Sequence, residues 1–396
     1  MYKNNQRNDM NTLTPQLAVN LASFAYKSKN ISKDNIAKIQ VPAMLRKQFM
    51  FNAQKSTLHG VSGTIAEHLL NHTSGFGFFG IGRAEGDFKN EAVIVFRGTA
   101  SMADAITDLH CGVTCSSNNK TVHAGFNKTF ESIKSQLAIL LDQLGNRPVH
   151  CVGHSLGGAI ANLAAVWIRS NYKIPVKLYT FGSPRVGFNA YAMQTETSLH
   201  GIYRAVHRSD PVPMVPVWPF VHAGKEYRLS TCVSLTGASH MMDGDAPGYI
   251  NTATRYSDYS QMQLGSIQNL AVVRLNYRKR HLACFNAHWS DKIGDALLTL
   301  LRESGKLSSI LAQATVGGTL TLYDALARGI VEISKMTTEY ADDAKGLLGH
   351  ILNFVGKPSV KVVDITYKFV KELLVLMLNK LNTLVRAAIP AVGIYM

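Results

Sequence analysis

A serine lies in a glycine-flanked motif that is typical of a nucleophile. Residues 153–157 read GHSLG and fit the pattern G-x-S-x-G. The apolar run 148–152 before the motif predicts a buried strand, and the small residues of 158–165 predict a helix after it. A serine at the turn between such a strand and such a helix is suited to attack a carbonyl carbon. We therefore predict that Ser155 is a nucleophile.

The glycines of this motif have a physical reason. A tight turn between strand and helix forces the serine into a strained backbone conformation, and side chains two positions before or after it would clash. Gly153 and Gly157 remove that clash. We expect the same turn to lift the Ser155 hydroxyl into the open. It should also aim the positive end of the following helix at the site, where negative charge develops during acyl transfer.

A nucleophilic serine needs two partners. A histidine takes its proton, and a carboxylate orients that histidine and stabilises its cation. With this motif the acid and then the histidine follow the serine in the chain. Asp210 is the candidate acid, because it follows the apolar run 202–207 and functional side chains gather at the ends of parallel strands. Four histidines are candidates for the proton acceptor, and residue type alone does not decide between them: His222, His240, His281 and His288.

The arrangement of apolar residues indicates which elements position these side chains. Between residues 75 and 230 short apolar runs alternate with helical stretches, which predicts an α/β fold with a mainly parallel sheet. The expected strands are 76–82, 92–96, 149–152, 176–181, 202–206 and 226–229. Residues 12–70 have a mostly helical pattern, and strand-like runs end near residue 285. We expect an α/β domain over 1–284 and a helical C-terminal region over 285–396.

The C-terminal region carries an amphipathic pattern. Val362, Ile365, Phe369, Leu373 and Leu376 are spaced as one face of a helix. Helix breaks are expected at 317–318, Gly346, Gly349 and 356–358. The apolar face has two interpretations. It packs against the rest of the protein, or it lies on a bilayer, because basic side chains flank it at Lys361, Lys368, Lys371, Lys380 and Arg386.

Residues 75–82 contain the pattern G-x-G-x-x-G, which also occurs in dinucleotide-binding loops. Such a loop requires a strand before it and a helix after it. Here aromatic residues alternate with glycine, and the charged turn 85–87 leads into another strand. We predict a glycine-rich strand of a hairpin and no nucleotide site.

Composition restricts the partners. The formal net charge of +15 suits a phospholipid surface, although a solvated basic face is the simpler explanation. There is no arginine-rich or aromatic-interleaved motif, so we expect no nucleic acid partner. The odd number of cysteines, five, suits a reducing compartment. The N-terminus lacks the basic and then apolar pattern of a signal peptide. We therefore expect synthesis in the cytoplasm without a Sec-type signal.

Several segments resemble, in the same order, the class 3 lipases, a family of α/β hydrolases that includes the fungal lipases. The matching segments are 93–99, 122–126, 152–159, 179–187 and 210–213. The resemblance covers roughly residues 75–250 and leaves out 1–70 and 255–396. It implies an α/β-hydrolase fold with a mostly parallel central sheet flanked by helices.

The resemblance also implies roles for particular residues. Asp210 corresponds to the acid and His240 to the histidine, and Tyr249 follows His240 as an aromatic residue does in the family. The interval of 30 residues between Asp210 and His240 is shorter than in the fungal members, and His288 is held in reserve. The oxyanion donors would be the N–H groups of Leu156 and Thr99. Residues 100–109 would form a lid, or else a fixed surface helix. No metal and no organic cofactor is expected.

Three functions follow from these observations. The first is a carboxylic ester hydrolase, a lipase or phospholipase, that acts on acyl lipids at a membrane surface through an acyl-enzyme intermediate. The second is an antibacterial effector that resembles the lipases injected by type VI secretion systems and is neutralised by an immunity protein. The third is an inactive hydrolase that serves as a binding scaffold. An intact Ser155, Asp210 and candidate histidine favour the enzyme over the scaffold.

Overall fold

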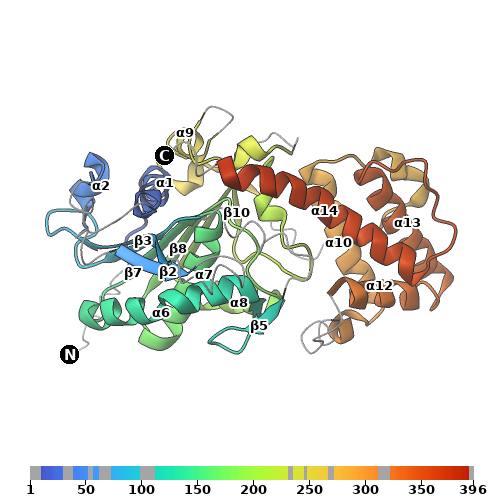
Figure 1. Cartoon of the computed structure of the whole chain (residues 1–396), viewed down its shortest axis with the longest axis horizontal. Coiled ribbons are helices and arrows are strands. Elements are labelled where there is room, and N and C mark those ends of the chain that lie inside the picture. The colour runs from blue at the N-terminus through green and yellow to red at the C-terminus, as the bar shows by residue number, and fades with distance from the viewer. Residues whose placement is uncertain are drawn as a thin grey trace, which may run out of the picture.

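The computed structural model shows an α/β body joined to a group of C-terminal helices (Figure 1). The structure describes residues 10–29, 39–51, 57–61, 73–98, 112–230, 235–244, 248–265, 272–310 and 322–391. The body holds α1 (Pro15–Phe24), α2 (Ala43–Gln48), α6 (Ala124–Leu144), α7 (Leu156–Tyr172), α8 (Asn189–Ser198) and α9 (Tyr249–Ala253). Short 3₁₀ helices relevant to the site are η1 (Ala25–Ser28), η4 (Val212–Met214), η5 (Gly237–His240) and η7 (Tyr277–Leu282).

The central sheet of the described residues has the strand order β1-β3-β4-β7-β8-β9-β10-β11, with β2 paired to β3. Its strands are β1 (Phe49–Met50), β2 (Thr57–Val61), β3 (Thr73–Gly82), β4 (Ala92–Phe96), β7 (Val149–His154), β8 (Val176–Phe181), β9 (Gly201–His207), β10 (Glu226–Ser230) and β11 (Gln263–Gly265). The five strands from β4 to β10 are parallel, and the outer pairings are antiparallel. The expected α/β fold with a mainly parallel sheet is confirmed.

Helices cover both faces of this sheet, which gives a three-layer α/β-hydrolase architecture. Successive side chains of β4 point to opposite faces of the sheet, so they contribute to two different hydrophobic cores. Ile94 and Phe96 pack with α6 and α7 on one face, while Val93 and Val95 pack with α1 and η1 on the other. A small hairpin of β5 (Val113–Cys115) and β6 (Thr121–His123) precedes α6.

The glycine-rich segment 75–82 lies in β3 and pairs antiparallel with β4, so the predicted hairpin strand is confirmed. Its glycines allow close backbone approach. A Cβ on Gly77 would lie 1.7 Å from the carbonyl oxygen of Val95. The mostly helical pattern expected for 12–70 does not hold over 57–61, where the chain forms β2 and pairs with β3. The reason is a tertiary contact: backbone pairing with the edge of β3 stabilises a strand here more than the local sequence favours a helix.

The C-terminal helices are α10 (Ala287–Glu303), α12 (Leu322–Ile333), α13 (Thr338–Phe354) and α14 (Tyr367–Ala391). In Figure 1 the long α14 runs from this group back to the α/β body near β10 and α9. One face of α14 is buried against both, through Val370, Leu374, Leu378, Leu381 and Val385. Of the two interpretations of this region, the structure confirms packing. Within the described residues, no helix combines the length and apolar character needed to cross a bilayer.

Two details of the C-terminal prediction are wrong. The predicted apolar face starts too early, because Val362 and Ile365 precede α14 in an extended segment and Leu376 is 37% exposed. Val362 is buried there, and its N–H donates to the hydroxyl of Tyr277. The predicted breaks at Gly346 and Gly349 lie inside α13.

These two glycines serve packing. A Cβ on Gly346 would lie 1.6 Å from the carbonyl oxygen of Leu275, and one on Gly349 would lie 2.6 Å from the ring of Tyr277. The absence of side chains lets α13 lie directly on the chain that leads into η7. These two glycines therefore mark a place where another segment packs closely against α13, and not the end of a helix.

We expect Gly346→Ala to lower the free energy of unfolding by about 1–3 kcal/mol, because the methyl group forces the chain around Leu275 away from α13. Gly294→Ala in α10 is the matched control, since nothing lies within 4 Å of its Cβ. The control should gain up to about 1 kcal/mol from helix propensity. Urea unfolding of both variants measures the difference, and equal effects of the two substitutions would contradict the contact.

Candidate active site

Ser155 occupies the turn between β7 and α7, with φ 56° and ψ −132°. A non-glycine residue with this φ is strained, at a cost of order 1–3 kcal/mol. A Cβ on Gly153 would lie 2.1 Å from the carbonyl oxygen of Gly157, and one on Gly157 would lie 2.2 Å from that of Phe96. The predicted reason for both glycines is confirmed.

The structure brings Ser155, His240 and Asp210 together in one chain of hydrogen bonds. The Ser155 hydroxyl lies 2.8 Å from Nε2 of His240, and Nδ1 of His240 lies 2.8 Å from Oδ2 of Asp210. A carboxylate oxygen only accepts, so Nδ1 carries the proton and Nε2 is free to accept the serine proton. Asp210 follows β9 and Ser155 follows β7, at the carboxyl ends of parallel strands, where the fold gathers its functional groups.

The other candidate histidines lie elsewhere. His222 donates from Nε2 to the carbonyl oxygen of Pro213 at 2.7 Å. His288 is exposed on α10, where its ring packs edge-on against Trp289. In the part of the chain that the structure describes, neither forms a hydrogen bond with Ser155. The reserve assignment of His288 therefore has no geometric support.

Tyr249 supports the acid, a role that the sequence did not reveal. Its hydroxyl donates to Oδ2 of Asp210 at 2.7 Å and accepts from the N–H of His207 at 3.2 Å. Burial, and then the charge of Asp210, raise the pKa of Tyr249 well above its usual value, so the donor stays protonated. The sequence placed an aromatic residue after His240 but gave no sign that its hydroxyl meets the acid.

Gly182 allows the acid and the histidine to approach. It has φ +55°, and a Cβ there would lie 2.7 Å from Oδ2 of Asp210 and 3.0 Å from Nδ1 of His240. The N–H of Val212 donates to the other carboxylate oxygen, Oδ1, at 2.8 Å. Asp210 is thus fully hydrogen-bonded on both oxygens, which compensates for the burial of its charge.

A second network joins Tyr26 and His154 to the site. Nε2 of His154 donates to the main-chain oxygen of His240 at 2.9 Å, so Nδ1 of the neutral ring accepts from the Tyr26 hydroxyl at 2.7 Å. Burial lowers the pKa of His154 well below its usual value and keeps the ring neutral. The Tyr26 hydroxyl also accepts from the N–H of Gly98. The network ties η1, the nucleophile turn and the backbone of His240 together, and sequence spacing offered no signal for it.

The structure describes one of the two expected oxyanion donors, Leu156, but not the other, Thr99. Leu156 is the first residue of α7, directly after Ser155. Thr99 and the whole expected lid, 100–109, lie outside the described residues. Just before Thr99, Arg97 is buried and donates from Nε to the oxygen of Gly75 and from Nη1 to the oxygen of Gly98. The chain leading to Thr99 is therefore anchored to β3.

The site is closed. Ser155 is 2% exposed and His240 is fully buried, so the expectation of an open hydroxyl is wrong for this structure. Gly98 lies directly against the nucleophile, since a Cβ there would be 3.0 Å from that of Ser155. Little of the Ser155 side chain is therefore open to solvent in this structure.

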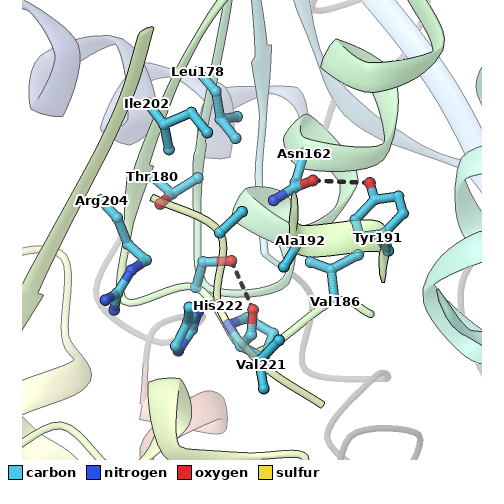
Figure 2. Close-up of a pocket in the computed structure, with 13 residues that line it drawn as sticks. Asn162, Leu178, Thr180, Val186, Tyr191, Ala192, Ile202, Arg204, Val221 and His222 are labelled. Carbon is cyan, nitrogen blue, oxygen red and sulfur yellow. Dashed lines mark hydrogen bonds between the residues drawn. The ribbon is translucent and has the colours of Figure 1, made fainter. Parts of the chain in front are cut away.

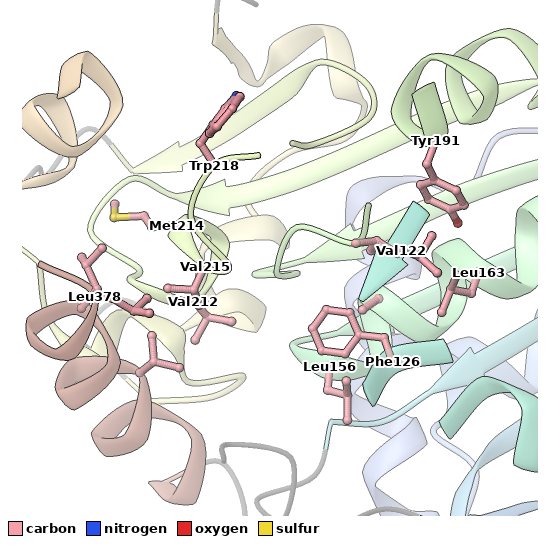
Figure 3. Close-up of a cluster of buried hydrophobic side chains, with 14 of the residues drawn as sticks. Val122, Phe126, Leu156, Leu163, Tyr191, Val212, Met214, Val215, Trp218 and Leu378 are labelled. Carbon is pink, nitrogen blue, oxygen red and sulfur yellow. The ribbon is translucent and has the colours of Figure 1, made fainter. Parts of the chain in front are cut away.

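Helix α14 contacts the segments that hold Asp210 and His240. It packs against η5, which ends at His240, and against η4, which starts two residues after Asp210. Figure 3 shows Leu378 of α14 beside Met214 and Val212. The C-terminal region therefore supports the site from outside, although its sequence carries no functional motif.

Removing the Tyr249 hydroxyl should lower kcat about tenfold, because Asp210 loses a hydrogen bond to its charged form. Tyr249→Phe is compared with Tyr259→Phe, which changes a buried tyrosine whose hydroxyl has no hydrogen-bond partner within the described part of the chain. Turnover of a soluble nitrophenyl ester measures both variants. The assignment fails if Tyr249→Phe is as active as the Tyr259 control.

In a comparison with known proteins, residues 93–220 match the family Lipase (class 3). The match ends before His240, so it covers strands β4, β7, β8 and β9 together with Ser155 and Asp210, but not the histidine. A secreted mono- and diacylglycerol lipase 1 from Fusarium solani is 35% identical over 149 residues, which are 36% of this chain and 44% of that protein.

Two further likenesses were found. Toxin TseL from Vibrio cholerae is 39% identical over 102 residues, 24% of this chain and 15% of that protein. The crystal structure of a lipase from Rhizopus microsporus var. chinensis is 27% identical, with a TM-score of 0.41 over 54% of this chain and 74% of that one. This chain spans less than half the length of either curated relative.

Proposed function

We propose that this protein hydrolyses carboxylic esters of acyl lipids, because residues 93–220 match the family Lipase (class 3). The observation that carries the proposal is the hydrogen-bonded chain from the Ser155 hydroxyl through His240 to Asp210. The similarity to a mono- and diacylglycerol lipase supports an acyl-lipid substrate.

The geometry supports the following reaction. The Ser155 oxygen attacks the ester carbonyl carbon as its proton passes to Nε2 of His240, and Asp210 stabilises the resulting imidazolium. The N–H of Leu156, and by resemblance that of Thr99, would hold the negative oxygen of the tetrahedral intermediate. His240 then gives its proton to the leaving alcohol, which leaves the acyl group on Ser155. Water, deprotonated by His240, attacks this acyl-enzyme and releases a fatty acid.

A paired assay tests the substrate. The full chain is offered a triglyceride emulsion and, separately, anionic phospholipid vesicles, and the released fatty acids are identified by mass spectrometry. The formal charge of +15 favours faster hydrolysis of the anionic vesicles. Release of fatty acid from neither substrate by folded protein would overturn the proposal.

The likeness to a protein named as a toxin favours a second candidate function. In this role the same hydrolysis damages the membranes of a rival cell after delivery by a contact-dependent secretion system, and a dedicated immunity protein neutralises the enzyme. Expression of the chain in the bacterial periplasm should stop growth, whereas the Ser155→Ala variant should be tolerated. Harmless expression of active wild-type enzyme there would exclude the toxin role while leaving the hydrolase intact.

A further inference from the structure

A large cavity lies between the α/β body and the C-terminal helices. Its volume is about 820 Å³, within the range of roughly 300–1,000 Å³ that is typical of small-molecule sites. The body contributes β10, the end of β9 and the loop 217–224, and the helical region contributes α10, α12 and α14. Ser155, Asp210 and His240 are not among the lining residues. The cavity is therefore a feature separate from the candidate active site.

The cavity lining contains a buried guanidinium, that of Arg204, on which the carboxylates of Glu226 and Asp291 act. Arg204 is 9% exposed, and its Nε has no hydrogen-bond partner among the residues that the structure describes. The carboxylate nearest to it, that of Glu226, lies 3.5 Å away and is bound more closely by Arg228, at 2.5 Å. In Figure 2 the side chain of Arg204 points away from Tyr191, on the side where His222 lies. A buried charge in this state attracts an anion.

Arg185 adds a second cation to the cavity lining. Its Nη1 donates to the main-chain oxygens of Met214 and Pro216, which are neutral acceptors. Its charge is opposed by the carboxylates of Asp291, Asp295 and Glu226, which line the same cavity without a described ion pair to Arg185, and Arg204 is the neighbouring cation. Six Arg and Lys side chains line the cavity against four Asp and Glu side chains, so its wall carries an excess of positive charge. Arginine suits planar carboxylate or phosphate groups because its donors form a rigid fork.

The other wall is apolar. It is formed by aliphatic and aromatic side chains of the loop 217–224 and of α10 and α14, namely Trp218, Leu297, Leu298, Leu374, Met377 and Leu381. Such a wall favours a hydrocarbon chain, because each buried methylene contributes about 0.8 kcal/mol. The cavity thus combines arginine side chains, in excess over acidic ones, with an apolar wall, and both together match an amphiphile.

We propose that this cavity binds a single-chain amphiphile with an anionic head, whose head contacts Arg185 and Arg204 and whose chain lies against α10 and α14. Two sources supply this chemistry: a fatty acid, with a carboxylate head, and a lysophospholipid, with a phosphate head. The site goes beyond the proposed ester hydrolysis and does not depend on Ser155.

The test uses the full-length Ser155→Ala chain, so that no ester is turned over. A twelve-carbon fatty acid carrying a diazirine is photocrosslinked, and the labelled peptides are identified by mass spectrometry. We expect labels on the peptides that contain Trp218 and residues 374–381. Dodecanoate and dodecanoyl lysophosphatidic acid serve as competitors, and dodecyl maltoside serves as the neutral control.

Variants make the head-group contact falsifiable. Arg185→Gln should weaken labelling at least tenfold, because a charge-assisted hydrogen bond is lost, whereas Arg278→Gln, an exposed arginine outside the cavity, should not. Leu298→Trp fills the cavity from a half-buried position and should also reduce labelling. Melting temperatures establish that each variant is folded.

Each outcome decides the proposal. Competition by both anionic amphiphiles supports it for either head, and competition by one alone supports it and identifies the source. Equal competition by dodecyl maltoside, labelling confined to peptides near Ser155, or equal labelling of the Arg185 and Arg278 variants would overturn it. None of these results bears on ester hydrolysis, which is measured separately with wild-type protein.

Discussion

Replacement of Ser155 by alanine is expected to reduce ester hydrolysis by roughly 10⁵- to 10⁶-fold while the fold is retained. The Ser155 hydroxyl is the group that would form the acyl-enzyme. In the chain of hydrogen bonds from Ser155 through His240 to Asp210, it is also the group that donates a proton to Nε2 of His240. The Ser155 side chain is small and its strain resides in the backbone, so alanine fits the same turn. Hydrolysis of a soluble nitrophenyl ester measures the loss.

The matched control is Ser334→Ala, because the Ser334 hydroxyl donates only to the carbonyl oxygen of Val331 at the end of α12. That variant should retain wild-type activity. Melting curves of both variants establish that folding is equal. If Ser155→Ala kept more than a few per cent of wild-type activity, another residue would have to be the nucleophile.

Asp210→Asn should lower kcat about 10⁴-fold. An asparagine amide facing Nδ1 of His240 would donate to it, so the ring proton would move to Nε2. In that tautomer His240 cannot accept the proton of Ser155, although every atom remains close to its original position. The N–H of Val212 donates to Oδ1 of Asp210, so the amide oxygen is expected at that position, and the amide nitrogen then takes the place of Oδ2 and faces Nδ1 of His240 and the Tyr249 hydroxyl.

The comparison for this variant is Asp243→Asn, which removes the same charge three residues after His240. Only the change at Asp210 should affect kcat, and the KM of both variants should stay near that of wild type because neither carboxylate is proposed to bind substrate. A similar loss of kcat in the two variants would show that charge near the loop, and not the orientation of His240, controls the rate.

Local chemistry made the nucleophile turn and the sheet predictable. Gly153, Ser155 and Gly157 are dictated by backbone sterics over five residues, and the parallel strands are short apolar runs that are buried on both faces. The elements that depend on distant partners were not predictable. Strand β2 forms only because β3 offers an edge, and Gly346 and Gly349 act through contacts with a segment about 70 residues earlier.

The support of the site was the least predictable part. Tyr26 reaches His154 across 128 residues of sequence, and α14 packs on η5 from the far end of the chain. These contacts join regions outside residues 93–220 to the segments around Ser155, His240 and Asp210. A single sequence contains no periodicity or motif that records such pairings. The burial of Ser155 likewise depends on packing around Gly98, which the motif itself does not specify.

The central claim is that His240, oriented by Asp210, activates Ser155. Its most direct test is the rate of labelling by a fluorophosphonate, followed by intact mass and peptide mapping, with phospholipid vesicles present to favour opening of the closed site. We predict one adduct per chain, located on Ser155, and a rate at least a thousandfold lower in His240→Ala. An adduct on another residue, or an unchanged rate in the His240 variant, would contradict this account.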